Sequence, residues 1–227
     1  IATILTKKFD LQKRGFHGFA HKSMLEKLKN NSKGKIITMQ LGGGCSITAT
    51  LDGKPIDTSM GYTPLEGLMM GTRSGSIDPG IIFYLLKKGM KSDDLEGLLN
   101  HGSGFKGLIG TDNIQKILEM KTKESQLTLD LFCRNIAKFI GSYMTLLGGV
   151  DILVFGGGIG ENCSLIRSEV ISYLNYSSIY IDENLNHFSY VHDQKISAIN
   201  SKAEIYVIKP DEELEIAKEV QELLINK

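Results

Sequence analysis

The sequence predicts an α/β domain with a mixed sheet, and three observations support this prediction. Three short β-rich runs separated by glycine turns lie between residues 35 and 57. A long amphipathic helical pattern covers 129–147, and after it apolar strand patterns alternate with helical ones. Antiparallel strands followed by alternating helices and strands are typical of a mixed sheet covered by helices.

The opening strands follow from composition and turn signals. Residues 36–39 are rich in β-formers, Gly42–Gly44 turns the chain, and 46–51 alternates toward a second turn. That turn, Asp52-Gly53, is a strong hairpin signal and leads to a third strand near 55–57.

The later elements follow from periodicity and glycine stops. Apolar residues recur every three or four positions over 129–147, and Gly148-Gly149 ends that helix. The remaining expected elements are helices over 79–88 and 93–99, a strand over 151–155, a glycine loop over 156–160 leading into a helix to 174, strands over 178–182 and 203–208, and a helix over 211–224.

Composition excludes several classes of function. The 227 residues carry zero formal net charge, so the chain has no electrostatic footprint for nucleic acid or an anionic membrane surface. The most apolar long stretch, 143–160, holds Asp151 and many glycines and does not suit a membrane span. Cys45, Cys133 and Cys163 lie far apart without a CxxC pair, which favours a reducing cytoplasm.

The segment 61–79, GYTPLEGLMMGTRSGSIDP, is the most informative part of the chain. Its glycines and prolines are unfavourable in a helix or strand, although several of its side chains suit a protein interior. Arg73 lies at its centre among small residues, where its guanidinium could bind phosphate or carboxylate. A surface arginine in a mobile loop is the alternative interpretation.

Two glycine loops follow apolar strands, at 41–44 and 156–160. Free backbone amides at a strand end can bind phosphate groups. The chain has no GxxxxGK[ST] motif, which excludes a P-loop NTPase. The second loop, followed by a helix and a strand ending at Asp182, partly resembles a dinucleotide fingerprint, but Glu161 or Cys163 occupies the position of its third glycine. A glycine turn without a ligand remains the other alternative.

Histidines and carboxylates supply further candidate groups. His17 and His21 stand four residues apart, a spacing that suits zinc on one helix face, but no third ligand is nearby and a structural role is the alternative. Asp211 and the two glutamates after it begin the last helix, where carboxylates stabilise the helix dipole.

Taken together, the motifs resemble the acetate and propionate kinase family of the actin-like, sugar-kinase and Hsp70 superfamily. They occur in the family's order, and the resemblance extends from about Arg14 to Ile216. The matching segments are GFHG at 15–18, LGGG at 41–44, DTSMGYTPLEGLMMGTRSG at 57–75, GGGIGEN at 156–162 and EEL at 212–214.

This resemblance implies a ribonuclease-H-like (actin-like ATPase) α/β fold, a mixed β-sheet flanked by helices. Residues 1–34 would form a connecting segment and 35–227 the C-terminal nucleotide-binding domain, with the family's N-terminal domain absent. The implied activity is reversible transfer of the γ-phosphoryl of ATP to acetate, giving acetyl phosphate and ADP. A cytoplasmic, homodimeric, Mg²⁺-dependent enzyme is expected.

The resemblance also implies the site residues. His17 and Arg73 would stabilise the charge of the transferred phosphoryl, Glu212 would hold Mg²⁺ through water, and Phe16 and Pro64 would line the acetate pocket. The implied ATP-binding residues are Gln40, Leu41, Gly42, Gly43, Gly44, Asp112, Asn113, Gly158, Ile159, Gly160, Glu161 and Asn162.

The sequence departs from the family in three places. HLGNG is replaced by QLGGG, Gln115 or Lys116 replaces an arginine in the adenosine segment, and Asp211 replaces an asparagine. These changes predict weaker or altered nucleotide binding. The family's carboxylate-binding arginine and catalytic aspartate have no counterpart, so the chain alone is expected to be inactive. Propionate kinase, butyrate kinase and a non-catalytic nucleotide-binding module are the alternatives.

Overall fold

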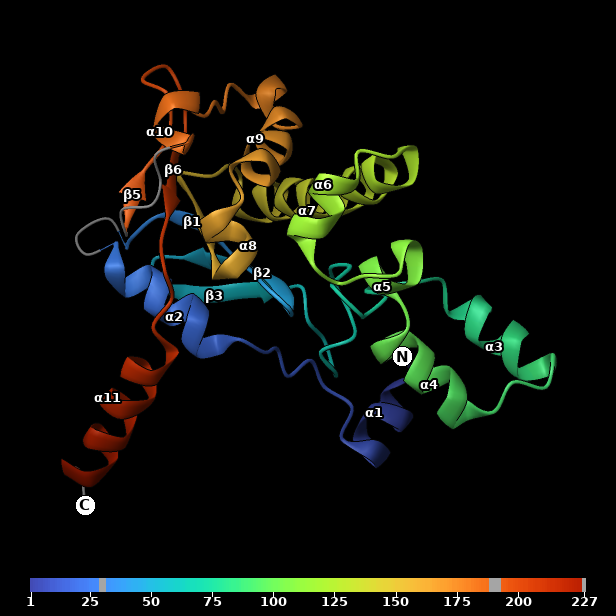
Figure 1. Cartoon of the computed structure of the whole chain (residues 1–227). Helices are drawn as coiled ribbons and strands as arrows, with labels where there is room; N and C mark the ends of the chain where they lie inside the picture. Colours follow the sequence, from blue (N-terminus) through green and yellow to red (C-terminus); the bar gives the residue numbers. More distant parts are fainter. Residues whose placement is uncertain (29–31, 188–192, 226–227) are drawn as a thin grey trace. The chain divides into compact units, whose positions relative to one another are not determined.

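The computed structural model describes residues 1–28, 32–187 and 193–225 (Figure 1). The chain divides into two compact units, which are described separately below. Unit 1 comprises residues 1–16, 43–45 and 59–135, and unit 2 comprises residues 17–42, 46–58 and 136–227.

Unit 2 is built on the sheet. Its six strands follow the order β3-β2-β1-β4-β6-β5. β1 and β4 are parallel, as are β4 and β6, whereas β2–β3 and β5–β6 are antiparallel. The strands are β1 (Lys35–Leu41), β2 (Cys45–Leu51), β3 (Lys54–Thr58), β4 (Ile152–Gly156), β5 (Gln194–Lys195) and β6 (Glu204–Val207). The expected mixed sheet is therefore confirmed.

Both faces of the central strands are buried. Met24 and Leu28, from α2 and its end, pack with Ile36, Ile152 and Val154 on one face of the sheet. Residues of the opposite parity are also inaccessible, as is typical of parallel strands covered on both sides. They are Ile37, Met39, Leu153 and Phe155.

The helices of unit 2 include α2 (Gly18–Lys27), α8 (Gly157–Asn162), α9 (Ser164–Ser172), α10 (Glu183–His187) and α11 (Glu212–Ile225). A 3₁₀ turn covers Asn175–Ser177. α11 packs on α2 (Figure 1). None of the described helices is both long and apolar enough to cross a bilayer.

Unit 1 is helical and contains the long central loop. Its helices are α1 (Thr3–Phe9), α3 (Pro79–Lys87), α4 (Ser92–His101), α5 (Gly104–Ile109) and α6 (Ile114–Met120), with the first half of α7 (Lys123–Leu147). The rings of Phe105 and Phe132 pack edge to face, with centroids 4.9 Å apart, and both are fully buried.

The structure contains helices that were not expected, among them α1, α2, α5 and α6, and several expected elements differ from it. Residues 178–182 do not form a strand; Ile181 makes an isolated bridge to Ser197. The expected glycine loop at 156–160 is mostly helical, because α8 begins at Gly157. α7 begins at Lys123 rather than near 129. Thr122 and Ser125 exchange side-chain and backbone hydrogen bonds at the start of this helix.

The hairpin turn is as predicted. Asp52 and Gly53 both have positive φ values, 50° and 80°, which is the conformation of a two-residue hairpin loop that matches the twist of its strands.

Candidate functional site

The candidate site in unit 2 lies where its parallel strands end. β1, β4 and β6 run in the same direction, so their carboxyl ends meet at one edge of the sheet. Gln40, near the end of β1, pairs with Gly156 at the end of β4. This register brings the two predicted glycine loops side by side, although more than a hundred residues separate them. In open α/β sheets this edge is the usual place for ligands.

Close packing at this edge requires glycine at two positions. A Cβ on Gly156 would lie 2.8 Å from the carbonyl oxygen of Ile208 and 3.3 Å from Pro210. A Cβ on Gly157, where φ is +76°, would lie 2.6 Å from the carbonyl oxygen of Leu41. The ends of all three parallel strands are thus in close backbone contact, which only glycine allows.

A buried arginine fixes the segment that follows. Arg167 of α9 is 1% exposed, and its Nη1 donates to the carbonyl oxygens of Gly160 and Glu161, both at 2.8 Å. Its Nε and Nη2 donate to Asn186 at 2.7 and 2.8 Å. Burial lowers the pKa of Arg167 to about 10, so it remains charged near neutral pH. The end of α8, which the sequence predicts to bind ATP, is therefore held by the buried, charged side chain of Arg167.

The junction of β6 and α11 completes this edge. Asp211 accepts from the backbone N–H of Leu214 at 3.0 Å, so it caps α11, as its position predicted. Its own N–H donates to Ser23 of α2 at 2.8 Å. Glu212, the next residue, is exposed and lines a hollow of about 830 Å³ together with Lys27 and Lys209.

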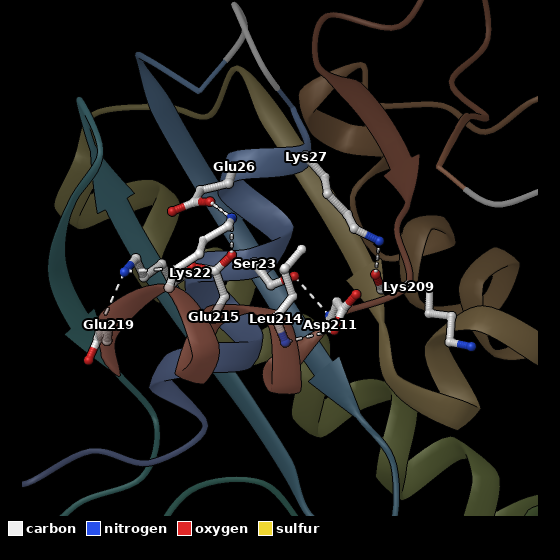
Figure 2. A network of polar contacts seen from close by, with 10 residues as sticks. Lys22, Ser23, Glu26, Lys27, Lys209, Asp211, Leu214, Glu215 and Glu219 are labelled. Atoms are coloured by element: carbon white, nitrogen blue, oxygen red, sulfur yellow. Dashed lines mark hydrogen bonds and ion pairs between the residues drawn. The ribbon is translucent and has the colours of Figure 1, made fainter. Parts of the chain in front are cut away.

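Ion pairs anchor α11 on α2 (Figure 2). Lys218 contacts Glu215 on its own helix and Glu26 on α2, at 2.6 and 2.5 Å. Lys22 of α2 pairs with Glu219 at 3.1 Å. Only Glu215 of these groups is fully buried. The network holds α11 on α2 in the turns that follow Glu212.

His17 is presented from a strained backbone. It precedes α2 with φ of 56° and ψ of 28°, a left-handed conformation that costs a non-glycine residue about 1–2 kcal/mol. Its ring is half-buried, and its Nδ1 lies 2.9 Å from the hydroxyl of Ser46. That hydroxyl is also 2.8 Å from Nε2 of the buried His21. The two histidines thus share one serine.

Arg73 lies in unit 1 in an ordered loop. Met70 and Arg73 are joined by a backbone hydrogen bond of 3.1 Å, and Ser74 N–H donates to Leu99 at 3.0 Å. A Cβ on Gly104 would lie 2.0 Å from the carbonyl oxygen of Met70, so α5 contacts this loop closely. The Arg73 side chain is half-buried, and its Nη1 lies 3.7 Å from the Met70 sulfur. The tight backbone contacts indicate an ordered loop and not a mobile one.

The other predicted residues of unit 1 are exposed or half-buried. Asn113 accepts from two backbone N–H groups at the start of α6, so its side chain serves as a helix cap. Asp112 is exposed and lies against Gly71. Phe16 and Pro64 are half-buried. Gly43 and Gly44 belong to unit 1, whereas Gln40, Leu41 and Gly42 belong to unit 2.

The sequence did not predict three residues that contact the candidate site residues. Ser46 and Thr38 contact the histidines, and Arg167 contacts the end of α8. A signal for Arg167 was present, because it falls in the apolar stripe 166, 167, 170 and 171 of α9. Among the described residues no group of three or more His, Cys, Asp or Glu side chains is arranged to hold a metal ion.

Comparison with known proteins agrees with this geometry. Residues 1–218 match the model of the acetokinase family. The acetate kinases of Sulfurimonas denitrificans and Carboxydothermus hydrogenoformans are 43% and 42% identical, each over 97% of this chain. The chain spans 57% and 58% of their lengths.

Solved structures give the same result. Acetate kinase from Porphyromonas gingivalis superposes with a TM-score of 0.93 at 33% identity, covering 99% of this chain and 59% of that one. A propionate kinase from Francisella tularensis superposes with a TM-score of 0.90 at 41% identity, covering 96% of this chain and 58% of that one.

Proposed function

Because the chain belongs to the acetokinase family, we propose that it is the nucleotide-binding part of an enzyme that transfers the γ-phosphoryl of ATP reversibly to acetate. The products are acetyl phosphate and ADP. The observation that carries the proposal is the meeting of β1, β4 and β6 at one edge, where Gly156 and Gly157 let three backbone segments approach closely.

The glycine loops suit the phosphates of ATP. Phosphoryl transfer needs mainly positioning and compensation of negative charge, which backbone amides and cationic side chains provide. Residues 40–44 would contact the phosphates and residues 158–162 the adenosine, with the latter segment held by Arg167. His17 and Arg73 are the proposed donors to the transferred phosphoryl group.

Magnesium fits this edge through few protein ligands. Mg²⁺ keeps several waters and binds through one or two carboxylates together with substrate phosphates. Glu212 offers one exposed carboxylate at the start of α11, beside a hollow, and no larger cluster of ligands is needed. When bound, the ion neutralises charge on the phosphate oxygens.

The acceptor is a short-chain carboxylate. The 41% identity to a propionate kinase is close to the 43% identity to an acetate kinase, so propionate is the second candidate. The chain spans 57% of the length of a related acetate kinase, and part of the carboxylate pocket would come from residues outside the span that it matches. A comparison of acetate and propionate as substrates distinguishes the two.

Self-association and location belong to the same proposal. α3 has no buried residue, and Phe83 and Tyr84 are 62% and 59% exposed. This apolar surface supports a homodimer contact.

The three cysteines are buried thiols, which suits the cytoplasm.

The decisive experiment changes Arg73 in an enzyme restored to the length of its relatives. Arg73→Lys keeps the charge but loses the planar fork, so we expect turnover in a hydroxamate assay to fall at least about 100-fold. The Michaelis constant for ATP should change less, because the lost contact strengthens in the transition state. Arg134→Lys, on an exposed part of α7, is the matched control. Equal activity of the two variants would refute the role of Arg73.

A further inference from the structure

Behind the ring of His17 lies a chain of three polar side chains from α2, β2 and β1. His17 Nδ1 is 2.9 Å from Ser46 Oγ, and Ser46 Oγ is 2.8 Å from His21 Nε2. The other nitrogen of that ring, His21 Nδ1, is 2.7 Å from Thr38 Oγ1. All four residues belong to unit 2.

The inner part of this hydrogen-bonded series of side chains is buried. Ser46 and Thr38 are 0% exposed and His21 is 4% exposed. Burial, followed by the nearby His17, lowers the pKa of His21 to about 3. His21 is therefore neutral at physiological pH and carries one ring proton, on either Nδ1 or Nε2.

With both histidines neutral, the hydrogen bonds can be ordered in two directions. In the first, Thr38 donates to His21 Nδ1, His21 Nε2 donates to Ser46, and Ser46 donates to His17 Nδ1. His17 then carries its own proton on Nε2. In the second, every bond is reversed, and His17 carries its proton on Nδ1. The tautomers of the two histidines are thus the same in either ordering.

Thr38 favours the first ordering. Within residues 1–28, 32–187 and 193–225, the Thr38 hydroxyl has one hydrogen-bond partner, His21 Nδ1. In the second ordering that nitrogen is a donor, and the buried Thr38 O–H is left without an acceptor. Leaving a buried donor unsatisfied is unfavourable, whereas the first ordering gives the buried donors of Thr38, His21 and Ser46 an acceptor each.

We propose that His21 is a positioning residue that acts through Ser46 to hold His17 in the tautomer with its proton on Nε2. The consequence rests on the proposed function. Phosphoryl oxygens only accept hydrogen bonds, so a neutral His17 can stabilise them only as a donor, and the side of the ring away from Ser46 then carries the proton.

The test is nitrogen NMR of the histidine rings in the ¹⁵N-labelled chain at about pH 8, where ordinary histidines are neutral. Spectra of His17→Ala and His21→Ala assign the two rings. We expect both to show the Nε2–H tautomer. In Ser46→Ala, His17 should become a mixture of tautomers. Ser125→Ala, which removes an equally buried hydroxyl from α7, should leave His17 unchanged.

Two results would overturn the proposal: a Nδ1–H tautomer at His17 in the unaltered chain, or the same His17 tautomer with and without the Ser46 hydroxyl. The spectrum of the unaltered chain decides the first point even if Ser46→Ala does not fold. No turnover is measured, so failure of the proposed phosphoryl transfer would be seen separately in the hydroxamate assay.

Discussion

At the scale of single residues, Gly157 shows why a glycine motif is required here. Its φ of +76° excludes a side chain, and so does the Leu41 carbonyl oxygen, which would lie 2.6 Å from a Cβ at this position. Gly158, the next residue, has open space around its Cβ position. We therefore expect Gly157→Ala to lower the free energy of unfolding by about 2–4 kcal/mol, from left-handed strain and overpacking.

Gly158→Ala is the matched control. It should change the free energy of unfolding by less than about 1 kcal/mol and could stabilise α8, because alanine favours helices. Denaturant unfolding of both variants, followed by circular dichroism, measures the difference. Equal stability of the two variants would show that the close approach to β1 is not real.

The same motif shows what a sequence can and cannot reveal about a site. The glycine runs at 41–44 and 156–160 were recognisable as phosphate-binding candidates from composition. Their meeting depends on the parallel pairing of Gln40 with Gly156, which is a long-range contact without a local signal. Ser46 likewise follows a glycine turn in an ordinary strand pattern, and only the fold shows that two histidines share it.

At the scale of elements, long and strongly periodic segments were predicted better than short ones. The pattern of α7 and the strong β-formers of β1 and β4 specify their structure locally. α8 was missed as a helix because glycine is a poor helix former; packing against β1 and the contacts from Arg167 compensate. Residues 178–182 form a single bridge, from Ile181 to Ser197, instead of the expected strand. Strand pairing depends on tertiary contacts, which the local sequence does not show.

Arg167 gives a prediction for α8. Arg167→Met keeps the length of the side chain but removes the donors to the carbonyl oxygens of Gly160, Glu161 and Asn186, of which those to Gly160 and Asn186 are buried hydrogen bonds. We expect a loss of about 2–4 kcal/mol in the free energy of unfolding. Arg134→Met, at an exposed position of α7, should cost less than about 1 kcal/mol. Similar losses in guanidinium unfolding would contradict a special role for Arg167.

The anchoring of α11 predicts a dependence on pH (Figure 2). The hydrogen bond from Lys218 lowers the pKa of Glu26 below its ordinary value of 4.5. A carboxylate with a lowered pKa stabilises the fold fully above about pH 4.5 and loses this contribution as pH falls through the lowered value. Lys218→Met should therefore lower the free energy of unfolding near pH 7, because it removes the cationic partner of Glu26 and of the buried Glu215.

The loss of stability at acid pH gives a sharper comparison between the variant and the unaltered chain. Between about pH 6 and pH 3, the free energy of unfolding should fall less steeply in Lys218→Met than in the unaltered chain, because the Glu26 contribution is already missing. Lys138→Met, at an exposed position of α7, should keep the original slope. Identical slopes in all three proteins would show that the α2–α11 ion pairs do not couple to folding.

At the scale of the whole molecule, the chain holds most of the proposed nucleotide site but spans only 57% of the length of a related acetate kinase. The strand ends, both glycine loops and Glu212 are all present in it. The expected N-terminal arginine and aspartate, which would bind and align the carboxylate, are not. Binding of nucleotide and turnover should therefore separate in this chain.

We accordingly expect this 227-residue chain to bind Mg²⁺–ATP weakly, with a dissociation constant on the order of 1 mM, or about −4 kcal/mol. It should show no turnover in the hydroxamate assay, because losing positioning groups costs orders of magnitude in rate. Calorimetry with ATP, with and without Mg²⁺, measures binding. Glu212→Gln removes the carboxylate proposed for the ion and should abolish most of the Mg²⁺ dependence, whereas Glu222→Gln, farther along α11, should retain it. Binding that gains as much from Mg²⁺ without Glu212 as with it would place the ion elsewhere, and the absence of any heat or thermal shift would show that the replacements at Gln40 and Gly43 have removed the nucleotide site.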